Sequence, residues 1–253
     1  MLIGKAGPAV TSIATAAADH VDVRGRDLTS DLMGRMGFTE YFYLLVTGKE
    51  PTDTQRFFLD LLLVAIAEHG LVPSVQSARM TLASGPDALQ GAVAAGILGA
   101  GSVILGAAED CGKLLVAIRE RGDPRAVLTE MRGRKEKMPG FGHPIHKPTD
   151  PRTERILALA NERGLDGVHI RIARELPALV ADIWGKPMPM NVSMPIAAVL
   201  LDLDFPPAML KAIPILGRTA SLLAHLAEEQ QRPIGFLMAS KGEEAIAYER
   251  GEE

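Results

Sequence analysis

Cysteine is nearly absent from this sequence, in which Cys111 is the one cysteine among 253 residues. A single cysteine excludes an intrachain disulfide and a metal site built from several thiolates, so the composition predicts a reducing, cytoplasmic location. Histidine is scarce as well, with six residues, and no two of them have the His-Glu-x-x-His spacing of a zinc peptidase. Because there is also no acidic loop of the calcium type, the sequence predicts no metal site.

An excess of positive charge is missing too. The sequence has 27 Lys and Arg against 31 Asp and Glu, a net charge of −4, and no basic tail, which argues against nucleic acid as a partner. The glycine pair Gly140 and Gly142 is not followed by Gly-Lys-Ser/Thr, so it does not form a P-loop. No Gly-x-Ser element lies between a strand and a helix, as a serine hydrolase would require. An anionic ligand would therefore need a local cluster of cations.

The chain has one long apolar run, from Leu89 to Ala108, in which Gln90 and Ser102 are the polar residues. The run has the length of a membrane span, but it contains five glycines and lacks flanking Trp, Tyr, Lys or Arg anchors. It therefore predicts a buried helix whose small residues let neighbouring helices approach closely, for example at a subunit interface. The N-terminus has no charged start before a long apolar segment, so we expect neither a signal peptide nor a membrane partner.

Alternating β-branched residues are also nearly absent, whereas helix start and stop signals recur. Thr52 with Gln55 has the spacing of a capping box, and Asp123 and Asp150 each precede a proline at a first helical position. Stop signals are expected at Gly48, Gly70, Gly122 and Gly164. The sequence predicts an all-α fold with helices from Thr52 to Gly70, after Asp123 and Asp150, and at about 29–47, 73–84, 110–121, 167–184, 191–203, 214–230 and 241–249.

Charge density rises after the apolar run and falls again near Trp184. This shift predicts a smaller helical domain, residues 96–198, inserted into a larger helical domain formed by residues 1–95 and 199–253. No repeat or low-complexity linker marks the boundaries more sharply.

Residues 137–156 hold the most informative pattern. A flexible turn, Pro139-Gly-Phe-Gly, precedes His143, and Asp150-Pro-Arg152 starts the next helix and fixes a cation nearby. Such a segment can bind a carboxylate and move a proton.

The same residues resemble the signature of the citrate synthase family. The resemblance continues in order along the chain, from about Asp27 to Phe236. The matching segments are Ala67-Glu-His-Gly70, Pro139-Gly-Phe-Gly-His143 with Lys147 and Asp150-Pro-Arg152, Met190-Asn-Val-Ser193, Arg218-Thr-Ala-Ser-Leu-Leu-Ala-His225 and Gln231-Arg-Pro233. The shortness of the chain makes it most similar to stand-alone citryl-CoA lyases and to the C-terminal module of ATP-citrate lyase.

This resemblance implies that His143 contacts the hydroxyl or carbonyl oxygen of a citrate or oxaloacetate moiety and that His69 binds the same ligand. It also implies that Arg152, Arg218 and, from a partner subunit, Arg232 hold the carboxylates, which suits the two-pronged pairing of guanidinium with carboxylate. Contacts to coenzyme A are expected from the cations and glycines around the turn, namely Arg134, Lys135, Lys137, Gly140 and Gly142. Coenzyme A would be a thioester substrate and not a cofactor, and no cofactor is expected. A homodimer is implied as well.

Each site residue also has a structural alternative. His143 can cap the helix at Asp150, Arg152 and Arg218 can pair with Glu154 and Glu228, and the basic residues before the turn can form a solvated face. His225 fits a packed, hydrogen-bonded core position. His20, His146 and His169 show no pattern that indicates a role.

Two departures from the family pattern bear on the reaction. Ser193 stands where the family has an aspartate that moves the α-proton of acetyl-CoA, and Gln90 aligns with a histidine that steadies the thioester enolate. A glutamine amide can donate to an enolate oxygen but cannot shuttle a proton. Citrate synthesis begins with removal of the weakly acidic α-proton of acetyl-CoA, so we expect the loss of the aspartate to slow synthesis more than cleavage. We therefore expect a citryl-CoA lyase-like reaction; citrate synthesis, or binding of CoA and carboxylate by a catalytically weakened member, are the alternatives.

Overall fold

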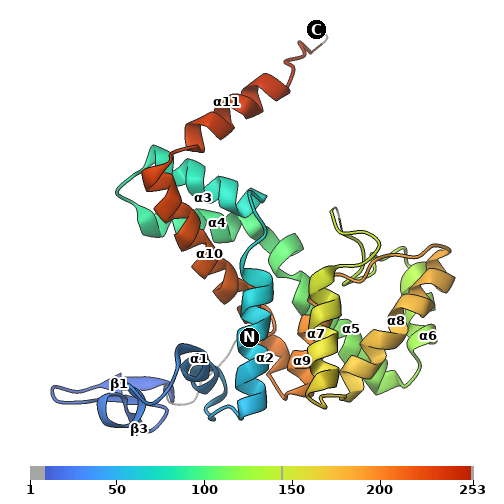
Figure 1. The fold of residues 1–253 in the computed structure, drawn as a ribbon, viewed down its shortest axis with the longest axis horizontal. Coiled ribbons are helices and arrows are strands. Elements are labelled where there is room, and N and C mark those ends of the chain that lie inside the picture. The colour runs from blue at the N-terminus through green and yellow to red at the C-terminus, as the bar shows by residue number, and fades with distance from the viewer. Residues whose placement is uncertain (1–8, 144, 252–253) are drawn as a thin grey trace. The chain divides into compact units, whose positions relative to one another are not determined.

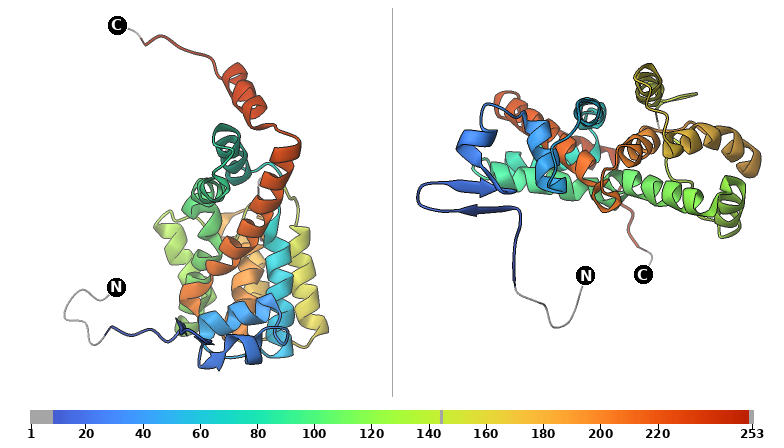
Figure 2. Two further views of the ribbon diagram at one scale, coloured as in Figure 1. Left: turned by 90° about the vertical axis from the view of Figure 1, so that its left-hand side faces the viewer. Right: turned by 90° about the horizontal axis from the view of Figure 1, so that it is seen from below.

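The computed structural model describes residues 9–143 and 145–251. Its internal contacts divide the chain into two compact units, Met1–Asp60 and Leu61–Glu253. Helices dominate both units, so the predicted all-α class is confirmed. Figures 1 and 2 show these elements as ribbons.

The first unit contains a small antiparallel sheet that the sequence did not indicate. Its strands are β1 (Ala14–Ala16), β2 (Val21–Val23) and β3 (Arg26–Asp27), followed by the π-helical turn η1 (Leu28–Leu32) and α1 (Phe38–Thr47). The prediction of one helix over 29–47 is therefore wrong. Gly34 has a φ of 75° and breaks the helical path, and Gly37 starts a new helix with its N–H bonded to the Glu40 carboxylate at 2.7 Å.

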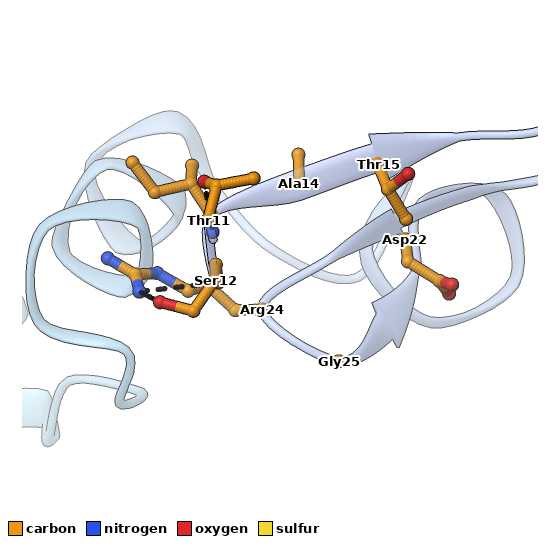
Figure 3. Close-up of a pocket in the computed structure, with 8 residues that line it drawn as sticks. Thr11, Ser12, Ala14, Thr15, Asp22, Arg24 and Gly25 are labelled. Carbon is orange, nitrogen blue, oxygen red and sulfur yellow. Dashed lines mark hydrogen bonds between the residues drawn. The ribbon is translucent and has the colours of Figure 1, made fainter. Parts of the chain in front are cut away.

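A pocket of about 170 Å³ lies beside β1 and β2 in this unit (Figure 3). The Arg24 guanidinium in it donates to the carbonyl and hydroxyl oxygens of Ser12, at 3.3 and 3.1 Å, and its Nε donates to the Leu45 carbonyl at 3.2 Å. These bonds tie the sheet to α1, so Arg24 serves the packing of the unit.

The helix α2 (Asp53–Ala67) crosses from the first unit into the second. The remaining helices belong to the second unit. They are α3 (Pro73–Ser84), α4 (Leu89–Leu105), α5 (Ala107–Arg121), α6 (Pro124–Gly133), α7 (Pro151–Glu162), α8 (Val168–Trp184), α9 (Ser193–Asp202), η2 (Pro207–Met209), α10 (Ala212–Gln231) and α11 (Gly235–Ala245).

The predicted caps are present. Thr52 and Gln55 exchange hydrogen bonds between the backbone N–H of each and the side chain of the other, at 2.8 and 3.2 Å. The Asp123 and Asp150 carboxylates accept from the backbone N–H of Ala126 and Arg152, both at 3.0 Å. Gly48 and Gly122 end their helices in the left-handed conformation. Local capping chemistry therefore sets these boundaries.

The last helix lies earlier than the predicted 241–249. The Glu229 carboxylate accepts from the backbone N–H groups of Ile234 and Gly235, at 2.9 and 2.7 Å, and so starts α11 at Gly235. Glu229 is itself buried and paired with Arg79 at 2.6 Å. A tertiary contact thus sets this helix start.

Within the second unit, α3, α4 and α10 pack together, as Figures 1 and 2 show, and the start of α11 at the buried Gly235 contacts α3. In a second set of helices, α5, α7 and α8 pack against the buried α9, and α6 packs on α5 and α8. The division into residues 1–95 with 199–253 and residues 96–198 stays a prediction.

The glycine-rich run forms α4, which packs closely as predicted. A Cβ atom at Gly96 would lie 2.7 Å from Leu222 of α10, and one at Gly99 would lie 2.6 Å from Ser77 of α3. The segment Leu89–Arg121 is long and apolar enough to cross a membrane by length and composition. Gly101 interrupts it with a φ of 56°, and its small residues serve close packing against α3 and α10. Leu98 and Val103 nevertheless remain 79% and 88% exposed.

Candidate active site

Three histidines converge in the second unit, although they come from distant parts of the sequence. His69 follows α2, whereas His143 and His146 lie in the loop between α6 and α7. One nitrogen from each ring lies within 4.8 Å of those of the other two. Ring centroids are 5.4 Å apart for His69 and His143 and 4.4 Å apart for His143 and His146.

The glycine turn before His143 is attached to the segment that leads into α9. Gly142 N–H donates to the Pro189 carbonyl, and Asn191 N–H donates to the Gly140 carbonyl, both at 2.8 Å. The Asn191 amide also donates to the Gly142 carbonyl at 3.1 Å. Two of the motifs singled out in the sequence therefore meet at one place, with Ser193 at the start of α9.

Replacing Gly140 by alanine should destabilise the protein more than replacing Gly142. Both have positive φ, 73° and 88°, but a Cβ atom at Gly140 would lie 2.8 Å from Cys111 Sγ and from Met194 Cβ, whereas no described atom lies within 4 Å of one at Gly142. We expect a loss of about 2–4 kcal/mol for Gly140→Ala, from strain plus overpacking, and about 1–2 kcal/mol for Gly142→Ala. Urea unfolding of the two variants measures the difference, and equal losses would contradict it.

His143 is held in one tautomer by its own loop. Its Nδ1 accepts from the backbone N–H groups of Ile145 and His146, at 3.1 and 2.9 Å. The neutral ring must therefore carry its proton on Nε2. Arg152 Nη2 lies 3.4 Å from this Nε2, and since both groups are donors, both are available to an oxygen ligand. Burial lowers the pKa of His143, and the nearby His146 and Arg152 lower it further against the attraction of Asp150, so the site favours the neutral ring.

Arg152 is fixed by the buried carboxylate of Asp150. Its Nε and Nη2 donate to the two Asp150 oxygens, at 3.0 and 2.8 Å. The Val192 backbone N–H also donates to Asp150, at 3.3 Å. Burial works to raise the pKa of Asp150, but the hydrogen bonds from Arg152 outweigh it and lower the pKa. The anionic Asp150 thus links the start of α7 to the segment before α9, and Arg152 pairs with Asp150 rather than with Glu154.

The Arg218 side chain is buried, and part of its guanidinium group has no hydrogen bond within the described residues. It is 5% exposed, and among the described residues its Nε and Nη1 have no hydrogen bond. Burial lowers its pKa, against the attraction of Glu68. The pKa of His69 is lowered by burial and then by Arg152, His143 and Arg218, which places all of these groups around one ring. Since a buried guanidinium is costly unless a negative charge pairs with it, Arg218 indicates a position suited to an anion.

Glu68 attaches His69 to the face of α10 that carries Arg218. One carboxylate oxygen accepts from the backbone N–H groups of His69 and Gly70, at 2.8 and 2.5 Å. The other accepts from the Ser221 hydroxyl and lies 3.0 Å from His225 Nε2. The hydrogen-bonded position predicted for His225 is thus confirmed, although its ring is half-buried.

Glu68→Gln should flatten the acid dependence of stability. Burial works to raise the pKa of Glu68, but bonds from Ser221, His225 and the backbone lower it from 4.5 to about 2. A carboxyl with a depressed folded pKa stabilises the protein fully above its unfolded pKa, and this stabilisation is lost as the pH falls from about 4.5 to about 2. Melting temperatures between pH 5 and 3 should therefore fall less steeply in Glu68→Gln than in the wild type.

The matched control for this change is Glu162→Gln, because Glu162 is an exposed carboxylate that pairs with exposed Arg155 on α7. Its melting curve should follow the wild type at each pH. A Glu68→Gln profile parallel to both would show that the hydrogen bonds to Glu68 are not maintained in solution.

Other predicted site residues lie outside this cluster. Gln90 is exposed at the start of α4, and Arg232 is exposed at the end of α10, where its carbonyl accepts from Arg79. Arg134 pairs with Glu136 at 2.6 Å. Lys137 and Arg134 line a pocket of about 400 Å³ that also contains Lys113, and Lys135 is exposed nearby. The roles predicted for all of these residues stay predictions.

No sequence pattern indicated a role for His146, which the structure brings into the cluster. The available signal was its spacing of three residues from His143 in a loop, which lets both rings face the same side. His169 has a different place, since its Nδ1 lies 2.7 Å from Asp202 in a buried pair that joins α8 to α9. His20 is exposed beside Asp19 and Asp22.

Three imidazoles this close have the geometry to hold a divalent cation. Arg152 and Arg218 both lower the pKa of His69, however, and their charges repel a cation and attract carboxylates. The cluster is therefore better suited to an anion, and the expectation of no metal stays a prediction.

Comparison with known proteins places this geometry in a family. Residues 6–235 match the family described as citrate synthase, C-terminal domain. The chain belongs to the citrate synthase family. It is 33% identical over 189 residues to putative citrate synthase 2 of Mycobacterium tuberculosis, an alignment that covers 72% of this chain and 50% of that protein. The chain spans about half the length of the curated relatives it matches.

Solved structures of the family agree with the fold. Citryl-CoA lyase from Hydrogenobacter thermophilus superposes with a TM-score of 0.87 at 30% identity, and the match covers 96% of this chain and 95% of that one. ATP citrate lyase from Methanosaeta concilii, solved with (3S)-citryl-CoA, superposes with a TM-score of 0.79 at 22% identity over 99% of this chain and 43% of that one. The second likeness concerns the fold alone.

Proposed function

We propose that this protein is a citryl-CoA lyase-like enzyme, which cleaves citryl-CoA or a related 3-hydroxy-3-carboxyacyl-CoA to acetyl-CoA and oxaloacetate. The observation that carries the proposal is the buried Arg218 guanidinium, two of whose nitrogens have no hydrogen bond in the described part of the chain, beside three histidines and Arg152. The near full-length likeness to a citryl-CoA lyase supports it. Citrate synthesis by the reverse bond formation is the alternative reaction.

The carboxylates of the citryl group would be held by Arg218 and Arg152, with His69 beside them. His69 Nε2 is buried without a hydrogen-bond partner among the described residues, so a ligand oxygen would satisfy it. A guanidinium paired with a carboxylate offsets the cost of removing both charges from water, whereas neutral donors would leave the negative charges of a polyanion unbalanced. Arg232 would complete the site from the partner subunit.

His143 would donate its Nε2–H to the oxygen on the tertiary carbon. As the C–C bond breaks, this oxygen passes from alkoxide to ketone, and a donor fixed in one tautomer stabilises its negative charge. The tautomer also means that neutral His143 does not accept the hydroxyl proton. Gln90 would donate to the thioester enolate oxygen once the site closes on the substrate.

Coenzyme A, as the thioester part of the substrate, would bind near the glycine turn. The pocket lined by Lys113, Arg134 and Lys137 offers cations for its phosphates, although Asp110 and Glu136 also line it. Lys135 lies next to Arg134, and the backbone at Gly140 and Gly142 would face the thioester arm.

Cleavage is favoured over synthesis because Ser193 stands at the start of α9, where the family places an aspartate. Synthesis must remove the α-proton of acetyl-CoA, and serine has no acid–base pKa near neutrality. The same observation favours a second function, a member that binds CoA thioester or carboxylate without turnover.

The deciding assay gives purified protein (3S)-citryl-CoA and follows acetyl-CoA and oxaloacetate. We expect turnover in the wild type and its loss in His143→Ala. Ligand binding without turnover would favour the second function, and absence of both would reject the proposal. Ser193→Asp should raise citrate synthesis from acetyl-CoA and oxaloacetate if the site geometry is that of the family.

A cytoplasmic homodimer is the proposed assembly. Phe236 and Leu237 on α11 are 69% and 56% exposed, and Leu98 and Val103 on α4 are also exposed. Apolar surface of this kind favours burial against a second copy of the chain. Sedimentation equilibrium should give twice the mass of the 253-residue chain.

A further inference from the structure

His146 has no role in the sequence motifs or in the proposed function. Its half-buried ring lies 4.4 Å from the ring of His143 and 5.7 Å from that of His69, centroid to centroid. Within the described part of the chain, no hydrogen bond occupies a nitrogen of this ring. Both nitrogens are thus free to exchange a proton with a ligand in the cluster.

The proposed cleavage needs a proton acceptor and a proton donor. The tertiary hydroxyl must lose its proton before the C–C bond breaks, and the enolate carbon must gain one to become the methyl group of acetyl-CoA. Ser193 and Gln90 do not transfer protons near neutral pH. His143 uses Nδ1 for two backbone N–H groups and carries its proton on Nε2, so it is not the acceptor.

The two remaining imidazoles differ in their surroundings. His69 is next to Arg152 and Arg218, whose positive charges oppose a proton on its ring, and its Nε2 is sealed from solvent. His146 instead is half-buried, and within the described residues its ring nitrogens make no hydrogen bond.

We propose that His146 is the acid–base catalyst of this site and carries one proton from oxygen to carbon. The neutral ring takes the hydroxyl proton, and the bond between the tertiary carbon and the acyl methylene breaks, leaving oxaloacetate and the thioester enolate. The imidazolium then protonates the enolate carbon, giving acetyl-CoA and a neutral ring. The hydroxyl oxygen and the departing carbon are bonded to the same atom, so one imidazole can reach both.

This inference rests on the proposed function, and its test is separable from the test of that function. The variants are His146→Gln and His146→Ala, compared with His20→Gln, which alters an exposed histidine paired with Asp19 and Asp22. With (3S)-citryl-CoA we expect kcat to fall by about 10²–10⁴-fold in both His146 variants and to be unchanged in His20→Gln. Calorimetric binding of oxaloacetate should change by less than about fivefold, since hydrogen bonds from the arginines persist.

Three further readouts separate chemistry from structure. Added imidazole should restore part of the turnover of His146→Ala, and the acid limb of the wild-type pH profile should disappear in His146→Gln. Circular dichroism checks that both variants fold. Three results would each overturn the inference alone. The first is turnover within threefold of wild type in either variant, and the second is a loss of oxaloacetate affinity in parallel with kcat. The third is inactivation of the wild type by EDTA with recovery on addition of Zn²⁺. A wild type without turnover would overturn the proposed function and this inference together.

Discussion

His143→Asn and His143→Ala should both lower kcat for citryl-CoA cleavage by about 10²–10³-fold, the usual cost of losing one donor to a developing oxyanion. Both variants remove the Nε2–H that lies beside Arg152 Nη2. KM should change less, because the arginines hold the ground-state carboxylates. Steady-state kinetics of the purified variants measures the separation of kcat from KM.

The two variants differ in what they do to the loop. His143 Nδ1 accepts from the backbone N–H groups two and three residues on, a pattern that an asparagine oxygen can reproduce. Hydrogen exchange at Ile145 and His146 should therefore increase in His143→Ala and stay close to wild type in His143→Asn. If activity were restored in the asparagine variant, His143 would serve only to shape the loop, and the proposed donor role would be rejected.

Arg218→Met should raise the stability of the unliganded protein and abolish useful affinity for oxaloacetate. The wild-type guanidinium is 5% exposed with Nε and Nη1 unpaired among the described residues, so replacing it by an apolar side chain of similar length removes a desolvation cost. The affinity should fall by about 2–5 kcal/mol, which is a factor of about 30–5,000 in Kd.

Thermal unfolding without ligand and calorimetric titration with oxaloacetate test the two halves of this expectation. Arg218→Lys is the matched control, because it keeps the charge but loses the two-pronged donor and should lose affinity without the gain in melting temperature. A less stable Arg218→Met protein with unchanged affinity would show that Arg218 is a structural residue rather than a ligand-binding one.

The sequence predicted most helices of the second unit because their boundaries depend on short-range chemistry. The caps at Asp123 and Asp150 and the stop at Gly122 need only residues within one turn. The N-terminal sheet was missed because its strands are two or three residues long, too short for an alternating pattern to register. The start of α11 was missed because it depends on Glu229, which Arg79 holds in place from α3.

The candidate site likewise has features that the sequence predicted and features that only the structure shows. The sequence by itself determined the family, the glycine turn with His143, the helix start at Asp150-Pro-Arg152, and the absence of an acid at Ser193, since all of these lie within contiguous motifs. Only the tertiary structure decided that His69 and Arg218 reach the same place, that Arg218 Nε and Nη1 have no hydrogen bond among the described residues, and that His146 is a third imidazole of the cluster. Pairing, burial and tautomer depend on atoms supplied by other helices, and no local pattern in a chain records which of its distant segments will supply them.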